Sequence, residues 1–216
     1  MPCPFPEAGR LPMHPPMPDV QLTFETLAGP ALHGLLPDLA HLRIAVFRDW
    51  PYLYEGDEAY ERDYLRAYAD APGAAVVVCR DGARIVGAAT CEPMTQGHAP
   101  VRQAFEAAGL DPAQHCYFGE SVLLAPWRGR GAGVRFFVER EAHARRIGLR
   151  HAAFCAVRRD PADPRCPAGY VPLDAFWRRR GYTPRAGLTV TFEWKEVGAT
   201  QATPHLLDFW TKDLGA

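Results

Sequence analysis

A glycine-rich hexamer in the second half of the chain is the residue pattern with the clearest chemical use. It reads Arg-Gly-Arg-Gly-Ala-Gly over residues 128–133, after an apolar stretch and before a stretch with helical periodicity. A turn in this position can direct several backbone N–H groups at one point, where the helix dipole also favours negative charge. The absent side chains of Gly129, Gly131 and Gly133 let a phosphate approach the backbone closely. The hexamer therefore predicts an anion-binding site.

The spacing of the hexamer excludes two common phosphate-binding motifs. A Walker loop requires G-x-x-x-x-G-K-[ST], and no Gly-Lys pair occurs in the sequence. A dinucleotide-binding G-x-G-x-x-G would need a glycine at the position of Val134. What remains is Arg128-x-x-Gly131-x-Gly133, which fits the pattern R/Q-x-x-G-x-G/A at each defined position.

This motif and a second one resemble those of the GNAT superfamily of acyl-CoA-dependent N-acyltransferases. R/Q-x-x-G-x-G/A is the superfamily's cofactor motif, and residues 122–127 resemble the apolar strand end and proline-containing turn that precede it. Residues 175–182, Ala-Phe-Trp-Arg-Arg-Arg-Gly-Tyr, resemble the superfamily's later F-Y-x-x-x-G-F segment. The two motifs stand in the superfamily's order and, together, cover roughly residues 116–196.

The resemblance implies a fold, a cofactor and a set of binding residues. The fold is a mixed α/β sheet, splayed between its fourth and fifth strands and flanked by helices, with acetyl-CoA in the opening. Backbone groups of residues 122–124 would pair with the pantetheine arm, and the amides of 129–134 would hold the pyrophosphate. Seven arginines between residues 128 and 150 suit the CoA phosphates, although those beyond Arg135 equally suit a solvated helix face. The implied cofactor-binding residues are Val122, Leu123, Leu124, Arg128, Gly129, Arg130, Gly131, Ala132, Gly133, Val134 and Trp177.

The implied reaction is attack of an amine on the thioester, which needs a base and an acid. Glu120 is the candidate base because it lies on the strand before the cofactor motif, where a carboxylate partly shielded from water is a competent base. The alternative is a structural carboxylate that accepts from a backbone amide. Many superfamily members carry a tyrosine acid at the position of Trp177, whose indole is only a hydrogen-bond donor. Tyr182, Tyr170 and Tyr117 are the substitutes, and Tyr182 is taken as the candidate acid.

An aromatic and acidic loop, residues 49–58, falls where the superfamily places its acceptor-binding loop. Trp50, Tyr52 and Tyr54 are the candidate substrate-binding residues, since aromatic walls and nearby carboxylates suit a cationic amine. A core-packing role fits Trp50 and Tyr52 equally well. Glu139 and His143 are four residues apart; with no third ligand nearby, we expect a surface pair and no metal site.

Periodicity places these residues in a series of strands and helices. The strongest local signal is Asp81-Gly82, which predicts a hairpin between strands 74–79 and 84–90 at the centre of the sheet. Gly148 and Gly181 are expected helix ends, and residues 158–172 a long surface loop. Further strands are expected at 20–27, 116–124, 151–157, 188–196 and 205–212, and helices at 38–47, 57–68, 101–108, 134–147 and 173–180.

Size, charge and cysteine content limit the class of protein. The 216 residues, 48% of them hydrophobic, suit one domain over residues 20–216 after a proline-rich leader, residues 1–19. A net charge of -1 gives no electrostatic case for nucleic acid or an anionic membrane as a partner. The six cysteines lack zinc-site spacing, and no apolar stretch approaches the ~20 residues that span a bilayer. We therefore expect reduced thiols in a cytoplasmic protein.

Three functions fit these observations. The first is an N-acetyltransferase that moves an acetyl group from acetyl-CoA to a primary amine of a small molecule or peptide. The second is a non-catalytic acyl-CoA-binding or regulatory module that kept the loop and lost the acid, as Trp177 permits. The third is an acyltransferase that acts on a protein through an exposed edge strand and the leader. The acceptor, the acyl chain length and the oligomeric state, for which a homodimer is one option, are left open by the sequence.

Overall fold

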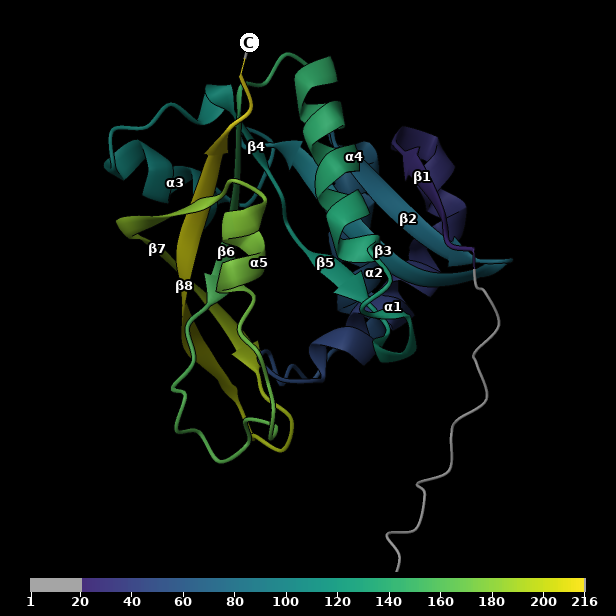
Figure 1. Ribbon diagram of the computed structural model, residues 1–216, viewed down its shortest axis with the longest axis vertical. Coiled ribbons are helices and arrows are strands. Elements are labelled where there is room, and N and C mark those ends of the chain that lie inside the picture. The colour runs from purple at the N-terminus through teal and green to yellow at the C-terminus, as the bar shows by residue number, and fades with distance from the viewer. Residues whose placement is uncertain (1–20, 216) are drawn as a thin grey trace, which may run out of the picture.

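Within residues 21–215, which the computed structural model describes, eight strands form one mixed sheet (Figure 1). Their order is β1-β2-β3-β4-β6-β8-β7, and β5 pairs with β3 off this path. The β4–β6 pair is parallel and the other pairs are antiparallel. The predicted mixed sheet is confirmed, and the leader lies outside the described residues. The strands are β1 (Thr23–Leu27), β2 (Ala75–Asp81), β3 (Arg84–Pro93), β4 (His115–Tyr117), β5 (Ser121–Leu123), β6 (His151–Val157), β7 (Thr183–Lys195) and β8 (Ala202–Asp213).

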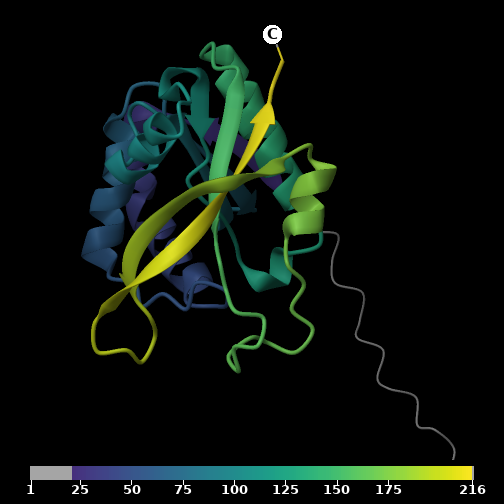
Figure 2. The same ribbon diagram turned by 90° about the vertical axis from the view of Figure 1, so that its left-hand side faces the viewer.

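Helices cover both faces of the sheet (Figure 2). Val76 and Val78 of β2 pack with α1 and α2, whereas Val77 and Cys79 pack with α4. Along β6, Ala153 and Cys155 share a core cluster with α3, and Phe154 lies with α5 on the other face. Alternate side chains of a strand point to opposite faces, so strands buried on both faces are almost wholly apolar. The helices are α1 (Leu36–Phe47), α2 (Glu58–Asp70), α3 (Ala99–Ala107), α4 (Ala132–Arg146) and α5 (Asp174–Arg179), with short 3-10 helices η1 (Gly29–Leu35), η2 (Pro112–Gln114) and η3 (Ala125–Trp127).

Several local sequence signals act as expected. Asp57 caps α2 by accepting a hydrogen bond from the Tyr60 N–H at 2.8 Å. The hairpin at Gly82 joins β2 to β3 inside the sheet, with Asp81 opposite Arg84. Gly148 follows α4 with a left-handed φ of 80°. The hairpin and the helix ends predicted from the sequence are therefore confirmed, while η1 was not predicted.

The continuous strand predicted over residues 116–124 is wrong, because the chain changes partners in the middle of it. β4 pairs with β6, and β5 pairs with β3. Gly119 lies in the break, where a Cβ would stand 2.2 Å from the Tyr68 hydroxyl, so a residue with a side chain would displace that tyrosine. The Glu120 N–H donates to the Thr90 hydroxyl at 3.2 Å. A glycine inside a strand pattern was the signal for this irregularity.

The break opens the sheet between β5 and β6. The Phe118 N–H donates to the Ala153 carbonyl at 2.8 Å, just past the β4–β6 register pair Tyr117 and Ala153. Beyond this point β6 continues to Val157 along β8, while β5 follows β3 (Figure 1). The splay that the resemblance implied between the predicted fourth and fifth strands is confirmed.

An arginine from α4 stabilises the break. Arg140 is 2% exposed and donates to the carbonyls of Thr90 and Glu120 at 3.3 and 3.1 Å, and to the Ser121 hydroxyl at 2.8 Å. These bonds satisfy backbone oxygens at the irregular point of the ladder. Arg140 was expected at the CoA phosphates or on a solvated face, and both expectations are wrong.

Two further expectations concern cysteines and membranes. Cys79, Cys91, Cys116, Cys155 and Cys166 are free thiols, as predicted for these five; Cys3 lies outside the described residues. Among residues 21–215, no helix combines the length and apolarity that crossing a bilayer requires.

Candidate cofactor and acceptor site

The turn of residues 128–134 follows β5 and η3 and includes the first three residues of α4. Gly131 is the N-cap of α4 with φ 83°, and Gly129 has φ 78°, both in the left-handed region that favours glycine. A Cβ at either position would meet nothing within 4 Å. Glycine is thus required there by backbone conformation, and the surroundings of the turn leave room for a ligand.

The first turn of α4 presents donors toward that space. The first bond into the helix runs from the Arg135 N–H to the Gly131 carbonyl at 3.1 Å. The N–H groups of Ala132, Gly133 and Val134 come before it, so α4 itself supplies no carbonyl for them. The positive end of the helix dipole lies at the same point. This geometry suits a phosphate or pyrophosphate group.

Three arginines surround the turn in different ways. Arg128 donates through Nε to the Leu123 carbonyl at 3.0 Å and lies 3.8 Å from the Asp49 carboxylate. It therefore braces the turn against β5. Arg130 and Arg135 line an open hollow of about 550 Å³ beside Gly131, together with Leu22, Thr23 and Phe24. These two arginines place positive charge next to the turn, part of which is neutralised because Arg135 pairs with Glu139 at 2.6 Å.

The remaining predicted cofactor residues lie on β5 and α5. Val122 and Leu123 pair with Ala88 and Gly87 of β3, and the Leu124 N–H donates to Val86 at 3.0 Å. The opposite edge of β5 faces the opening. Trp177 packs at 5.1 Å between the rings of Phe154 and Trp210, in the core behind β6. On the same helix Phe176 reaches the turn instead, 3.4 Å from where a Gly133 Cβ would be.

Glu120 lies at the sheet break inside a buried group of polar side chains. The Arg43 Nη1 is 2.5 Å from Glu120 Oε1, and the Tyr64 hydroxyl donates to Glu120 Oε2 at 3.0 Å. Arg43 also donates through Nε to Glu61, which is fully buried. Burial and the Glu120 carboxylate raise the pKa of Tyr64, so its hydroxyl keeps its proton at neutral pH. Glu120 is therefore held by an ion pair from α1 and a hydrogen bond from α2.

A second buried carboxylate lies close to Glu120. Glu92 of β3 is 4% exposed, and burial raises its pKa to about 7, with Glu120 adding to the shift and a hydrogen bond from Tyr68 opposing it. The His98 ring stacks on the Tyr64 ring, with centroids 5.4 Å apart. Burial lowers the pKa of His98, which favours its neutral form. Two carboxylates, a neutral imidazole and phenols thus meet beside the sheet opening.

The aromatic and acidic loop, residues 49–58, called the aromatic loop below, contributes two of its three predicted residues to this region. Burial raises the pKa of Tyr52, and the nearby Cys155 and Glu120 raise it further. Burial likewise raises the pKa of Tyr54, beside Glu61. Trp50 instead contacts Tyr170 of the long loop, with ring centroids 6.1 Å apart. Tyr52 and Tyr54 are brought to the Glu120 group, and Trp50 is not.

Tyr182 is not brought to this region. It is fully buried, and its hydroxyl donates at 3.2 Å to Glu141, which also binds Lys212. Its hydroxyl is therefore committed to an ion pair in the core on the α4 side of the sheet. Tyr117 lies at the sheet opening, with its hydroxyl 3.2 Å from the Cys155 sulfur.

The Glu139–His143 surface pair predicted from the sequence is wrong. His143 is 4% exposed and its Nε2 lies 2.8 Å from the Gly73 carbonyl, while Glu139 pairs with Arg135 at 2.6 Å. Among the described residues, no group of three or more His, Cys, Asp or Glu side chains could hold a metal ion.

The side chains that contact Glu120 were not predicted from the sequence. Arg43 stood in the apolar stretch of the predicted helix 38–47, where a lone charge is unusual. Glu61, Tyr64 and Tyr68 recur at spacings of three and four, so they share one face of α2. These two signals were available. Their meeting point was not, because it depends on how the helices pack on the sheet.

Comparisons with known proteins agree with this geometry. Residues 39–182 match the model of the family described as "Acetyltransferase (GNAT) family". A ribosomal-protein-alanine N-acetyltransferase from Brucella melitensis has a similar fold, with a TM-score of 0.58, 17% identity and coverage of 88% of this chain and 99% of that one. The Salmonella typhimurium protein yncA, solved with its cofactor acetyl-CoA, gives a TM-score of 0.57, 13% identity and coverage of 91% and 95%. A search of curated protein sequences finds no match. The family match spans two thirds of the sequence, and the chain therefore belongs to the GNAT acetyltransferase family.

Proposed function

We propose that this protein is an acetyl-CoA-dependent N-acetyltransferase that acts on a primary amine. The observation that carries the proposal is the combination of an opened sheet, a donor-rich turn at its edge and a buried carboxylate at the break. Acetyl-CoA would lie along β5 with its pyrophosphate on the amides of residues 129–134, and it would supply the activated acetyl group. Arg130 and Arg135 would add charge for the remaining phosphate.

Glu120 is the proposed base. Its carboxylate lies at the break, fixed by Arg43 and Tyr64. The attacking ammonium must lose a proton before its nitrogen can form the amide bond, and the leaving sulfur must gain one. Glu120 would accept the first proton, directly or through one water. Tyr52 and Tyr54 would form part of the wall around the amine.

A thiol-release assay across a panel of primary amines tests this proposal. At least one amine should accelerate CoA release from acetyl-CoA, and Glu120→Gln should lower kcat about 100-fold, within the usual range for one acid–base group. Affinity for CoA should not change in this variant, because Glu120 lies outside the turn. Unchanged turnover in Glu120→Gln would remove Glu120 from the mechanism.

A non-catalytic acyl-CoA-binding module is the second candidate, and one observation favours it. Both carboxylate oxygens of Glu120 already accept a hydrogen bond or an ion pair from the protein. Tight CoA binding without thiol release for any amine tested would support this second function. Gly131→Asp should abolish CoA binding under either function, because it places a negative charge where the pyrophosphate would lie.

A further inference from the structure

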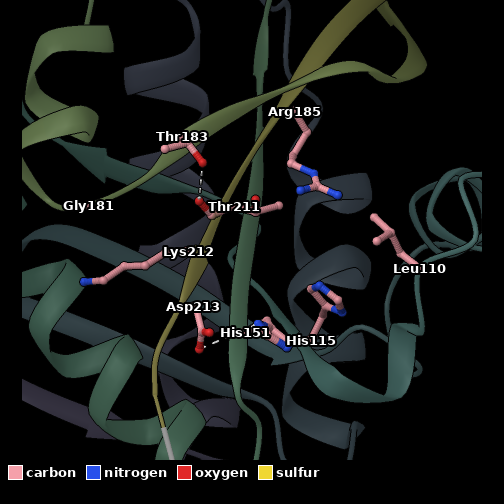
Figure 3. A pocket seen from close by; sticks show the side chains of 9 residues that line it. All are labelled: Leu110, His115, His151, Gly181, Thr183, Arg185, Thr211, Lys212 and Asp213. Carbon is pink, nitrogen blue, oxygen red and sulfur yellow. Dashed lines mark hydrogen bonds and ion pairs between the residues drawn. The ribbon is translucent and has the colours of Figure 1, made fainter.

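A separate pocket lies at the other end of β4 from Glu120. Its volume is about 360 Å³, at the lower end of the range for small-molecule sites. It is formed by the starts of β4, β6 and β7, the end of β8 and the segment after α3 (Figure 3). It shares no lining residue with the turn of residues 128–134 or with the Glu120 group. The residues that line it are Leu110, His115, His151, Gly181, Thr183, Arg185, Thr211, Lys212 and Asp213.

An irregularity of β7 places an arginine over this pocket. Pro184 pairs with Trp210, and the next paired residue, Thr189, lies opposite Asp208. Four residues of β7 therefore face the single residue Phe209, and Gly187 within them has φ 79°. Such bulges redirect side chains out of the regular alternation. Here the bulge brings the Arg185 guanidinium to the pocket (Figure 3).

The charges of the pocket favour an anion at one end. Among residues 21–215, no carboxylate forms an ion pair with Arg185. Lys212 points away from the histidines and donates to both oxygens of Glu141 at 2.8 Å (Figure 3). Asp213 lies 3.9 Å from His151, at the opposite end from Arg185. Arg185 is thus an exposed cation that lines the pocket together with His115.

His115 adds a group that can gain a proton. Its Nδ1 lies 2.7 Å from the Asp111 carbonyl, which only accepts, so Nδ1 carries hydrogen and Nε2 is the nitrogen that titrates. Burial lowers the pKa of His115, and His151 and Arg185 lower it further. The hydrogen bond to Asp111 and the Asp111 carboxylate act in the opposite direction. The Phe105 ring packs edge-on against the His115 ring, with ring centroids 5.0 Å apart. A bound anion would reverse the repulsion from Arg185 and favour the imidazolium.

We propose that this pocket binds the phosphoryl group of a small phosphate monoester, through the Arg185 fork and a protonated His115. The volume exceeds what a bare oxyanion fills, so the organic part of the ligand would contact Leu110 and Thr211. The dianion takes up a proton at His115 on binding, so affinity rises as pH falls toward the second pKa of the monoester, which is about 6. The site is distinct from the CoA turn and does not depend on the acetyltransferase proposal.

Calorimetry on the full chain, both without CoA and with CoA present, tests the site. Inorganic phosphate and glycerol phosphate are titrated near pH 8, where both are largely dianions, in two buffers of different ionisation enthalpy. Both should bind, glycerol phosphate more tightly, with net proton uptake. Arg185→Ala should weaken both about tenfold or more, the loss of one charge-assisted contact. His115→Gln should weaken binding and remove the proton uptake.

Arg179→Ala is the matched control, because Arg179 is an exposed arginine of α5 outside the pocket. It should bind phosphate like the unchanged protein. Equal affinity in Arg185→Ala, or binding without proton uptake, would overturn the proposal. Loss of phosphate binding in the presence of CoA would also overturn the proposal, because it would show that phosphate binds at the turn of residues 128–134. If inorganic phosphate bound more tightly than glycerol phosphate, the ligand would be the free phosphate ion, and the monoester assignment would be wrong.

Discussion

Single residues near the opening carry charges that the fold must stabilise. Arg43 lies between Glu61 and Glu120, all three nearly inaccessible to water. A buried carboxylate without its partner is costly, whereas an exposed pair contributes little. From the sequence alone, Glu120 could be proposed because it stands next to a recognisable motif. Roles for Arg43 and Glu92 could not be predicted from the sequence, because their contacts with Glu120 join segments that are distant in the chain.

Arg43→Ala should destabilise the protein by roughly 3–5 kcal/mol, since it leaves two buried carboxylates unpaired. Arg66→Ala is the control, because Arg66 forms an exposed pair with Asp63 and should cost less than about 1 kcal/mol. Urea denaturation measures both. Equal effects would mean that the Arg43 contacts contribute no more than a surface pair.

Glu92→Gln should change the pH dependence of stability. The pKa of Glu92 is about 7 in the folded protein and 4.5 as an ordinary glutamate. The folded state therefore binds this proton more tightly, and the contribution to stability is present below pH 4.5 and lost as the pH rises through 7. The amide mimics the protonated acid, so the variant should be more stable than the unchanged protein near pH 8, by on the order of 3 kcal/mol.

Near pH 4 the difference between Glu92→Gln and the unchanged protein should vanish. Denaturation curves at both pH values test this pH dependence. Glu25→Gln is the control, because Glu25 is exposed. A gap of the same size at both pH values would show that Glu92 does not titrate in this range.

Elements with strong local chemistry were predictable, and elements defined by long-range pairing were not. Asp57, Gly82 and Gly148 act within a few residues of themselves, so their effects can be inferred directly from the sequence. The break between β4 and β5 depends on Tyr68 and Arg140, which come from two different helices. β7 begins at Thr183, five residues before its predicted start, because Pro184 and the bulge interrupt the alternation.

Gly131→Ala should show what the turn before α4 requires. A residue with a Cβ at φ 83° costs roughly 1–2 kcal/mol, so we expect lower stability and weaker CoA binding by calorimetry. Gly133→Ala is the matched control for stability. It lies within the first turn of α4, and its new Cβ would meet Phe176 at an ordinary 3.4 Å. Similar losses of stability in both variants would mean that the left-handed conformation is not the determinant.

At the scale of the whole molecule, one arginine joins three separate segments. Arg159 of the long loop donates to the carbonyls of Pro51 and Tyr52 at 2.5 and 2.8 Å, and pairs with Glu196 beyond β7. The aromatic loop also bonds to that region directly, with Tyr54 bridged to Glu196. The long loop was predicted as a surface connection. Its role in fixing the aromatic loop depends on contacts over more than 100 residues of sequence.

Arg159→Ala should destabilise the protein by about 2–4 kcal/mol and, if the aromatic loop binds the acceptor, raise KM for the amine more than it lowers kcat. Arg158→Ala removes an exposed pair with Asp208 and should leave both nearly unchanged. Denaturation and steady-state kinetics provide the two measurements. Loss of stability without a change in KM would separate the loop's structural role from acceptor binding.

The change of partners at residues 118–120 has a consequence for motion. β3 meets β4 through only two register pairs, Glu92 with Tyr117 and Pro93 with Cys116. One core cluster takes its strand residues from β2, β3 and β5, and another takes them from β4, β6, β7 and β8. A third cluster crosses the seam beneath α4, where Ala75 and Cys91 pack with Cys116 and Phe154. The two parts of the sheet are therefore tied together by packing at the β4 end and separate toward β5. Amide hydrogen exchange should be slower at the tied end than along the separated edges of β5 and β6.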